Sequence, residues 1–150
     1  SCYNEQPFRY LVATGDDDEA FARMLACLVE GNRAWAQAVP VLALGVVATS
    51  FARNGSPNAH ARHDLGLASA NLTLEAAARG LSVHQMAGIL PDVARETWGI
   101  PEGYEAVTGL ALGYADPASK IERDRAPRTR RPLAETVFAG SWGAPAPFLP

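Results

Sequence analysis

The spacing of apolar positions predicts one strand and two helices at the beginning of the chain. The apolar run Phe8–Val12 predicts a strand. Asp16 and Glu19 then have the spacing of a capping box, with an aspartate in the cap position. An amphipathic helix ending near Gly31 is predicted by apolar residues at helical spacing, namely Phe21, Met24, Leu25, Leu28 and Val29. A second, short helix is expected over Asn32–Ala38.

The middle of the chain is more apolar. The run Val41–Ala48 shows no alternation, which predicts a strand covered on both faces. The segment Thr49–Ala59 contains Asn, Gly, Ser and Pro and is expected to be a loop. A long helix is expected over Asp64–Arg79, because an acid suits its first turn, a base suits its last turn, and Gly80 is a good C′ residue.

The predicted long helix is too apolar for a small monomer. No charge lies between Asp64 and Glu75, and apolar or small residues cover most of its circumference. A helix that is apolar nearly all round is buried nearly all round. Because a domain of this size has little room for such a helix, we expect a second subunit to cover it.

The C-terminal half divides into a structured part and a tail. A short strand is expected over Leu81–His84 and the last strand over Tyr104–Tyr114, with a helix over Asp92–Trp98 between them. From Asp116 the composition changes to proline, charge and glycine, which predicts an extended tail. We therefore expect one domain over 1–150, with a core over 1–114 and a tail over 115–150. The tail is expected to pack on the partner subunit through Val137, Phe138, Trp142 and Phe148.

Composition sets the class of protein. A chain of 150 residues makes one domain that buries roughly two-thirds of its unfolded surface. A hydrophobic fraction of 48% and a charged fraction of 19% are typical of a soluble globular protein, and a net charge of −3 argues against nucleic-acid or membrane partners. Only two cysteines are present and no apolar run reaches about 20 residues, so we expect a cytoplasmic protein.

Two polar segments are candidate binding sites. The first eight residues, Ser1–Phe8, combine hydroxyl, thiol and amide groups beside a strand, and form either a ligand loop or a polar tail. Six of the 13 basic residues lie over Lys120–Arg131 and form either a phosphate site or a solvated tail. In an extended backbone Arg128 and Arg130 point the same way, which suits one anion.

The remaining polar residues do not assemble a catalytic set. His60, His63 and Asp64 have no third convergent metal ligand, so a hydrated helix start is favoured over a metal site. His84 is interpreted as a hydrogen-bonded histidine, and Cys2 has no identifiable base partner. An enzyme would therefore need a cofactor to carry the chemistry.

Five segments, taken in order, resemble motifs of the FMN-dependent nitroreductase family. Ser1–Phe8 resembles the family's Ser-Ser-x-Asn-x-Gln-Pro-Trp loop, with Phe8 in place of tryptophan. The other four are Gly31-Asn32 with Trp35-Ala36 and Pro40, Asp64-Leu65-Gly66 with Asn71-Leu72, His84-Gln85-Met86-Ala87-Gly88, and Arg128-Thr129-Arg130-Arg131-Pro132-Leu133. Family members also carry an Arg-x-Ser-x-Arg-type helix before the first loop, so we expect this chain to be N-terminally incomplete.

The resemblance implies a fold, an assembly and a cofactor site. The fold would be α+β, with a central mixed sheet flanked by helices. The assembly would be a homodimer with the long helix in its core and FMN at the subunit interface. The implied flavin contacts are Ser1, Cys2 and Asn4 to the ring and ribityl chain, Asn32 to the pyrimidine side, Met86, Ala87 and Gly88 near the reactive nitrogen, and Arg128 and Arg130 to the phosphate.

The resemblance also implies a reaction. NAD(P)H would reduce FMN, and a nitroaromatic or quinone-like acceptor would then take the electrons at the same site, with no side chain as obligatory acid or base. The loop Thr49–Ala59 is expected to shape the acceptor pocket. Alternatives that stay open are other flavin chemistry on the same fold (dehalogenation, azoline oxidation or flavin breakdown) and a non-catalytic flavin-binding or dimerising remnant.

Overall fold

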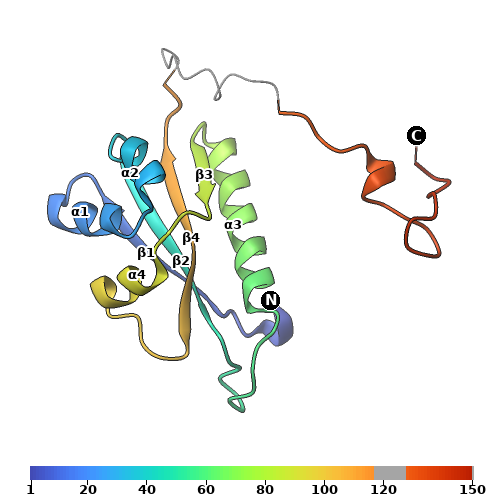
Figure 1. Cartoon of the computed structure of the whole chain (residues 1–150), viewed down its shortest axis with the longest axis horizontal. Coiled ribbons are helices and arrows are strands. Elements are labelled where there is room, and N and C mark those ends of the chain that lie inside the picture. Colours follow the sequence, from blue (N-terminus) through green and yellow to red (C-terminus); the bar gives the residue numbers. More distant parts are fainter. Residues whose placement is uncertain (117–127, 150) are drawn as a thin grey trace. The chain divides into compact units, whose positions relative to one another are not determined.

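The computed structural model describes residues 1–116 and 128–149. Its core is a four-stranded sheet with the order β1-β2-β4-β3 (Figure 1). The strands are β1 (Phe8–Thr14), β2 (Val41–Ala48), β3 (Ser82–Met86) and β4 (Tyr104–Gly113). All four predicted strands are therefore confirmed, with shifts of a few residues at their ends.

The sheet is antiparallel rather than mixed. Each neighbouring pair, β1 with β2, β2 with β4 and β4 with β3, runs in opposite directions. Strands β2 and β3 are joined through a helix and run in the same direction, but β4 lies between them. Because β4 separates these two strands, no neighbouring pair is parallel in the part of the chain that the structure describes. The prediction of a mixed sheet is therefore wrong there.

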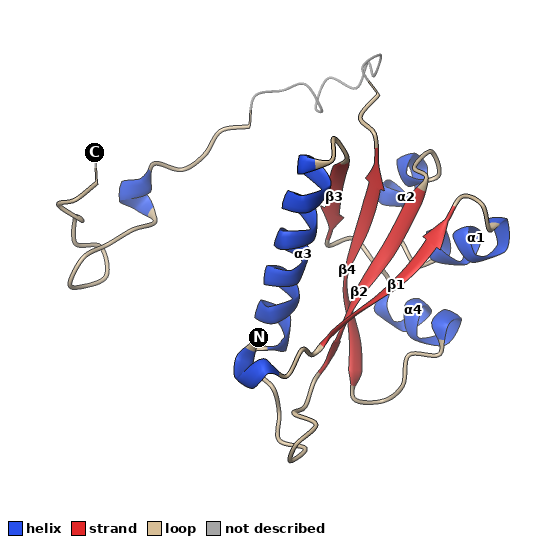
Figure 2. Cartoon of the chain, turned by 180° about the vertical axis from the view of Figure 1, so that it is seen from behind, coloured by secondary structure: helices blue, strands red, loops and turns tan. Residues whose placement is uncertain are grey.

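Helices cover both faces of the sheet. Figures 1 and 2 show α3 (Ala61–Ala78) on one face and α1 (Asp18–Ala26), α2 (Glu30–Ala36) and α4 (Pro91–Trp98) on the other. The larger apolar cluster joins the three shorter helices to the sheet, and a smaller one joins α3 to it. This α+β arrangement is the fold class that the resemblance implied.

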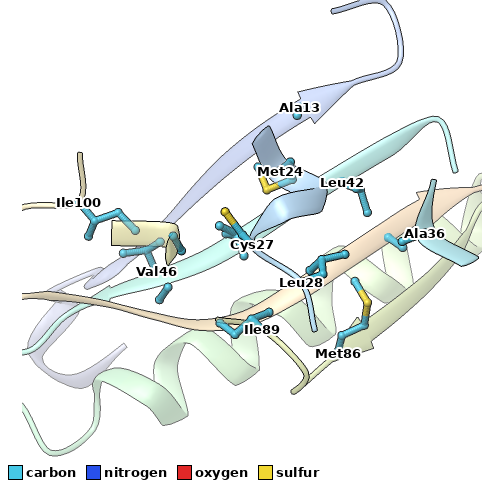
Figure 3. Packing of buried hydrophobic residues seen from close by; sticks show 14 residues of the cluster. Ala13, Met24, Cys27, Leu28, Ala36, Leu42, Val46, Met86, Ile89 and Ile100 are labelled. Atoms are coloured by element: carbon cyan, nitrogen blue, oxygen red, sulfur yellow. The ribbon is translucent and has the colours of Figure 1, made fainter. Parts of the chain in front are cut away.

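Strand β2 supplies side chains to both layers. Every second residue of β2, namely Leu42, Leu44 and Val46, faces the layer of α1, α2 and α4. Figure 3 shows Leu42 and Val46 beside Met24 and Cys27. On the α3 side, a Cβ on Gly45 would lie 3.2 Å from the Leu65 side chain, so this glycine allows close approach of the helix. The prediction that β2 is covered on both faces is confirmed.

The first helix ends earlier than its apolar spacing predicts. Helix α1 ends at Ala26, and Leu28 then pairs with Ile89 in an isolated β-bridge. The predicted end near Gly31 is wrong because this pairing pulls the chain out of the helix. The N-cap is Asp17, whose carboxylate accepts the Ala20 N–H at 2.9 Å, rather than Asp16.

In a single chain, helix α3 buries only one side. Its buried residues are Ala61, Asp64, Leu65, Ser69 and Ala76. Leu67 is 49% exposed and Leu74 is 69% exposed, on the side away from the sheet. The predicted burial all round therefore does not arise within one chain, because the sheet offers only one surface. The predicted C′ role of Gly80 agrees with its φ of +77°.

The C-terminal residues form a separate unit, which is described by itself. Within this unit, residues 128–149 contain the short 3₁₀ helix η2 (Leu133–Glu135) and a β-bridge between Phe138 and Pro145. The rings of Phe138 and Trp142 lie 5.2 Å apart, and Trp142 is 93% exposed. Residues 117–127, which carry part of the basic segment expected over Lys120–Arg131, lie outside the described residues.

No helix in residues 1–116 and 128–149 is long and apolar enough to cross a membrane.

Candidate functional site

The N-terminal loop is fixed to the core by hydrogen bonds. It forms a short 3₁₀ turn, η1 (Cys2–Asn4). The Cys2 N–H donates to both carboxylate oxygens of Asp64, at 3.0 and 3.2 Å, and Asp64 is only 3% exposed in the first turn of α3. The Gln6 N–H donates to the Ser1 hydroxyl at 3.0 Å. The loop is therefore an ordered part of the fold rather than a free polar tail.

This loop has an unusual backbone. Tyr3, Asn4 and Gln6 have φ values of +51°, +57° and +50°, and no other non-glycine residue in the described ranges has a positive φ. Asparagine tolerates the left-handed region, whereas a tyrosine there costs free energy. The Gln6 amide donates to the Asn4 side-chain oxygen at 3.0 Å, which helps to hold the turn. Backbone strain of this kind concentrates where a ligand is held.

A second cluster forms between α2 and the turn that follows β3. The Asn32 amide donates to the Gly88 carbonyl at 3.0 Å, and the Val29 N–H donates to the same oxygen at 3.1 Å. A Cβ on Gly88 would lie 2.5 Å from Asn32 Nδ2, so only glycine fits. The N–H groups of Ala87 and Gly88 donate to no acceptor among the residues that the structure describes. Two neighbouring backbone N–H groups, one of them from a residue without a side chain, therefore have no acceptor among the described residues.

Met86 takes a different place from its two neighbours. Its side chain is 3% exposed and lies in the core, with Cε 3.2 Å from where a Cβ on Gly109 would be (Figure 3). Its carbonyl accepts the Thr108 hydroxyl at 2.9 Å. Any ligand contact by Met86 is thus limited to its backbone, whereas Ala87 is exposed.

The two clusters lie on opposite faces of the sheet. The N-terminal loop is bonded to Asp64 of α3, and Gly88 is bonded to Asn32 of α2. Figures 1 and 2 show α3 and α2 on different sides of the strands. No hydrogen bond connects the two clusters in the described part of the chain. The structure thus brings Asn32 and Gly88 together but does not bring Ser1, Cys2 or Asn4 to them within one chain.

The two C-terminal arginines are exposed, and neither forms an ion pair with an acid among the described residues. Arg130 donates only to the neighbouring Thr129 carbonyl, at 3.2 Å, and Arg128 has no partner among the described residues. By contrast, Arg131 pairs with Glu135 at 3.4 Å. Both predicted phosphate ligands are therefore available to an anion.

The role of Asp64 was not foreseen from the sequence. The sequence pattern favours a hydrated helix start for His60, His63 and Asp64, whereas the buried Asp64 carboxylate accepts the Cys2 N–H. Within the described residues no group of three or more His, Cys, Asp or Glu side chains could hold a metal ion. The available signal was an acid in the first turn of the helix, followed by ten residues without charge before Glu75.

A pocket of about 360 Å³ lies between the N-terminal loop and the loop after β2. Glu5, Gln6 and Arg9 line one side, and residues of the segment Thr49–Ala59 line the other. The Glu5 carboxylate accepts the Ala52 N–H at 2.7 Å, which ties the two loops together. The loop expected to shape an acceptor pocket thus borders a cavity.

Comparisons with known proteins identify the family of the chain. The model of the nitroreductase family matches residues 1–114. An uncharacterized 15.4 kDa protein of Mycolicibacterium smegmatis is 39% identical over 140 residues, which cover 88% of this chain and 92% of that protein.

Solved structures share the fold. An oxidoreductase containing FMN matches with a TM-score of 0.87 and 29% identity, over 96% of this chain and 76% of that one. A nitroreductase family protein of Clostridium difficile 630 has a TM-score of 0.70 and 21% identity, over 94% of this chain and 78% of that one, and supports the fold alone. From the match over residues 1–114 and the 39% identical relative, the chain belongs to the nitroreductase family.

Proposed function

We propose that the protein is an FMN-dependent NAD(P)H oxidoreductase of the nitroreductase type, which reduces nitroaromatic or quinone-like acceptors by a ping-pong reaction. The observation that carries this proposal is the hydrogen bond between Asn32 and Gly88. These residues are 56 positions apart, and the family resemblance assigns both to the flavin. The similar oxidoreductase that contains FMN supports the choice of cofactor.

The turn after β3 fits a flat aromatic ligand. Gly88 offers no side chain, and Ala87 offers only a methyl group, so a planar ring can approach the backbone closely. Their N–H groups donate to no acceptor in the described part of the chain and suit a ring nitrogen or oxygen that gains negative charge. When bound, FMN supplies the two-electron chemistry, taking a hydride from NAD(P)H and passing electrons to the acceptor. The chain's own residues hold and orient the ring.

The other residues that would contact FMN are proposed from their charge and position. Arg128 and Arg130 would hold the phosphate, since guanidinium groups bind phosphate oxygens through paired N–H donors. Asn32 keeps its side-chain oxygen for the pyrimidine side while its amide is bonded to Gly88. Ser1, Cys2 and Asn4 would contact the ring and ribityl chain from the strained loop.

We further propose a homodimer in which these ligands meet. The N-terminal loop and the Gly88 turn lie on opposite faces of one chain, so a single flavin would contact the loop of one subunit and the turn of its partner. The exposed side of α3, with Leu67 and Leu74, supplies an apolar surface for that contact. The exposed aromatic residues of the C-terminal unit would pack on the partner. The two cysteines form no disulfide, which favours a cytoplasmic location.

The test is turnover by protein loaded with FMN. Oxidation of NADH or NADPH is followed with and without a nitroaromatic or quinone acceptor. We expect oxidation that depends on both FMN and acceptor, with parallel lines in double-reciprocal plots. Bound FMN without nucleotide oxidation would contradict the enzymatic proposal and leave a flavin-binding protein. Products from a panel of acceptors distinguish nitroreduction from dehalogenation, azoline oxidation and flavin breakdown.

A further inference from the structure

An arginine is stacked on an aromatic platform beside the strained N-terminal loop. The Arg53 guanidinium carbon lies 4.3 Å from the centre of the Tyr3 ring and 5.2 Å from that of Phe51. The two rings meet edge to face, with centroids 6.1 Å apart. Such stacking fixes the plane of a guanidinium while leaving its N–H groups at the rim. The orientation of the Arg53 guanidinium is therefore set by its contacts with the two rings, and not by hydrogen bonds from its N–H groups.

The charge of Arg53 is uncompensated. In residues 1–116 and 128–149 it forms no ion pair and donates no hydrogen bond, and its side chain is exposed. Glu5, the acid that contacts this loop, accepts the Ala52 N–H instead. An oriented guanidinium with free donors is prepared for a carboxylate or phosphate.

The position of this group links it to the proposed site. Tyr3 lies within η1, between Cys2 and Asn4, which we assign to the flavin. Arg53 lies in the loop after β2, which borders the pocket lined by Glu5 and Gln6. A co-substrate that reaches the flavin beside η1 would pass the platform. This step rests on the proposed function, whereas the anion-binding property of Arg53 does not.

We propose that Arg53, held by Tyr3 and Phe51, binds the anionic group of an aromatic co-substrate. Carboxylate and phosphate share the required chemistry, a planar or trigonal set of oxygens that accepts paired N–H donors. The carboxylate would belong to the electron acceptor, and the phosphate to a nicotinamide nucleotide. Arg53 thus sets specificity for charge, without a part in electron transfer.

The experiment compares matched probes by titration calorimetry on the full chain. The two anionic probes are 4-nitrobenzoate and adenosine 2′,5′-bisphosphate. Each is compared with a compound that lacks the tested anionic group, namely neutral 4-nitrobenzamide and adenosine 5′-monophosphate, which has no 2′-phosphate. We expect Arg53→Gln to weaken at least one of the two anionic probes about tenfold, the effect of one charge-assisted contact, and to leave 4-nitrobenzamide unchanged. Arg23→Gln is the control, because Arg23 also stacks on an aromatic ring, that of Trp98, at 4.9 Å between α1 and α4.

A second pair of variants tests the platform. Tyr3→Phe keeps a ring under Arg53 and should bind the anionic probe as the unmodified chain does, whereas Tyr3→Leu should weaken it. The probe whose affinity falls in Arg53→Gln identifies the co-substrate that Arg53 binds. Loss of 4-nitrobenzoate binding indicates the electron acceptor, and loss of bisphosphate binding indicates the nicotinamide nucleotide. Equal affinity of Arg53→Gln and the unmodified chain for both anionic probes would overturn the proposal. FMN uptake is measured on the same samples, so a failure to bind flavin is distinguished from a failure of Arg53 to bind anions.

Discussion

At the residue scale, Gly88 both packs against α2 and lies in the proposed flavin site. Its carbonyl receives donors from Asn32 and Val29, and its Cβ position is already occupied by their side chains. The same absence of a side chain leaves its own N–H accessible. One residue thus fixes the distance between α2 and the turn after β3 and exposes backbone donors to a ligand.

Gly88→Ala should therefore destabilise the fold and weaken FMN binding. The new methyl group would lie 2.5 Å from Asn32 and 2.7 Å from Val29, and overpacking of this kind costs about 1–3 kcal/mol. Urea unfolding measures the loss. Gly31→Ala is the matched control, since its Cβ meets nothing within 4 Å and alanine favours its helix. Equal stability of Gly88→Ala and the unmodified chain would contradict the packing argument.

Cys27 provides a pH-dependent contribution to stability. Burial raises the pKa of its thiol from the ordinary value of 9.0, because the apolar surroundings disfavour the thiolate. The folded pKa exceeds the unfolded one, so the contribution is complete below pH 9 and is lost as pH rises above it.

The unfolding free energy should therefore fall between pH 9 and pH 10, by at most about 1.4 kcal/mol per pH unit from this group. Cys27→Ala should remove that part of the slope although it lowers stability at every pH. Chemical denaturation at both pH values measures the difference. Identical slopes in the two proteins would show that Cys27 is not responsible.

At the element scale, a single carboxylate connects α3 to the N-terminal loop. Asp64→Ala should lower the unfolding free energy by about 1–3 kcal/mol, since the part-buried Cys2 N–H loses its acceptor, and should weaken FMN binding. Asp64→Asn keeps one acceptor oxygen and should lose less. Asp92→Ala removes an exposed acid from the first turn of α4 and serves as the control. An effect of Asp64→Ala no larger than that of the control would refute this role.

Helix α3 also presents the surface proposed for dimerisation. Leu74→Glu should raise the dimer dissociation constant roughly 100-fold or more, because a charge would be buried without a partner. Sedimentation velocity follows the change. Ala22→Glu places the same charge on an exposed position of α1 and should leave the dimer intact. A stable monomer of the unmodified chain would contradict the proposed assembly.

Most elements were predictable because their apolar spacing is local. Strand β2 and helix α4 followed from runs that any short window reveals. The end of α1 was not predictable, because the Leu28–Ile89 bridge joins segments about 60 residues apart. The antiparallel sheet depends on which strand inserts between β2 and β3, which no local pattern specifies.

At the scale of the whole molecule, the candidate site was only partly predictable. From the residues alone, the N-terminal loop could be either a polar tail or a ligand loop. The family resemblance assigned Asn32 and Gly88 to one flavin, but their hydrogen bond was seen only in the structure. The roles of Asp64 and Arg53 were not predicted, because they arise from contacts with Cys2 and Tyr3 that the fold creates. The placement of the two clusters on opposite faces likewise became visible only in the structure.

The central claim is that two copies of this chain hold FMN between them. It is tested most directly by titrating FMN into the purified protein and recording visible absorbance during sedimentation. The account predicts one FMN per chain, sedimenting with a dimer. Protein that contains no flavin and takes up none when FMN is added would contradict it.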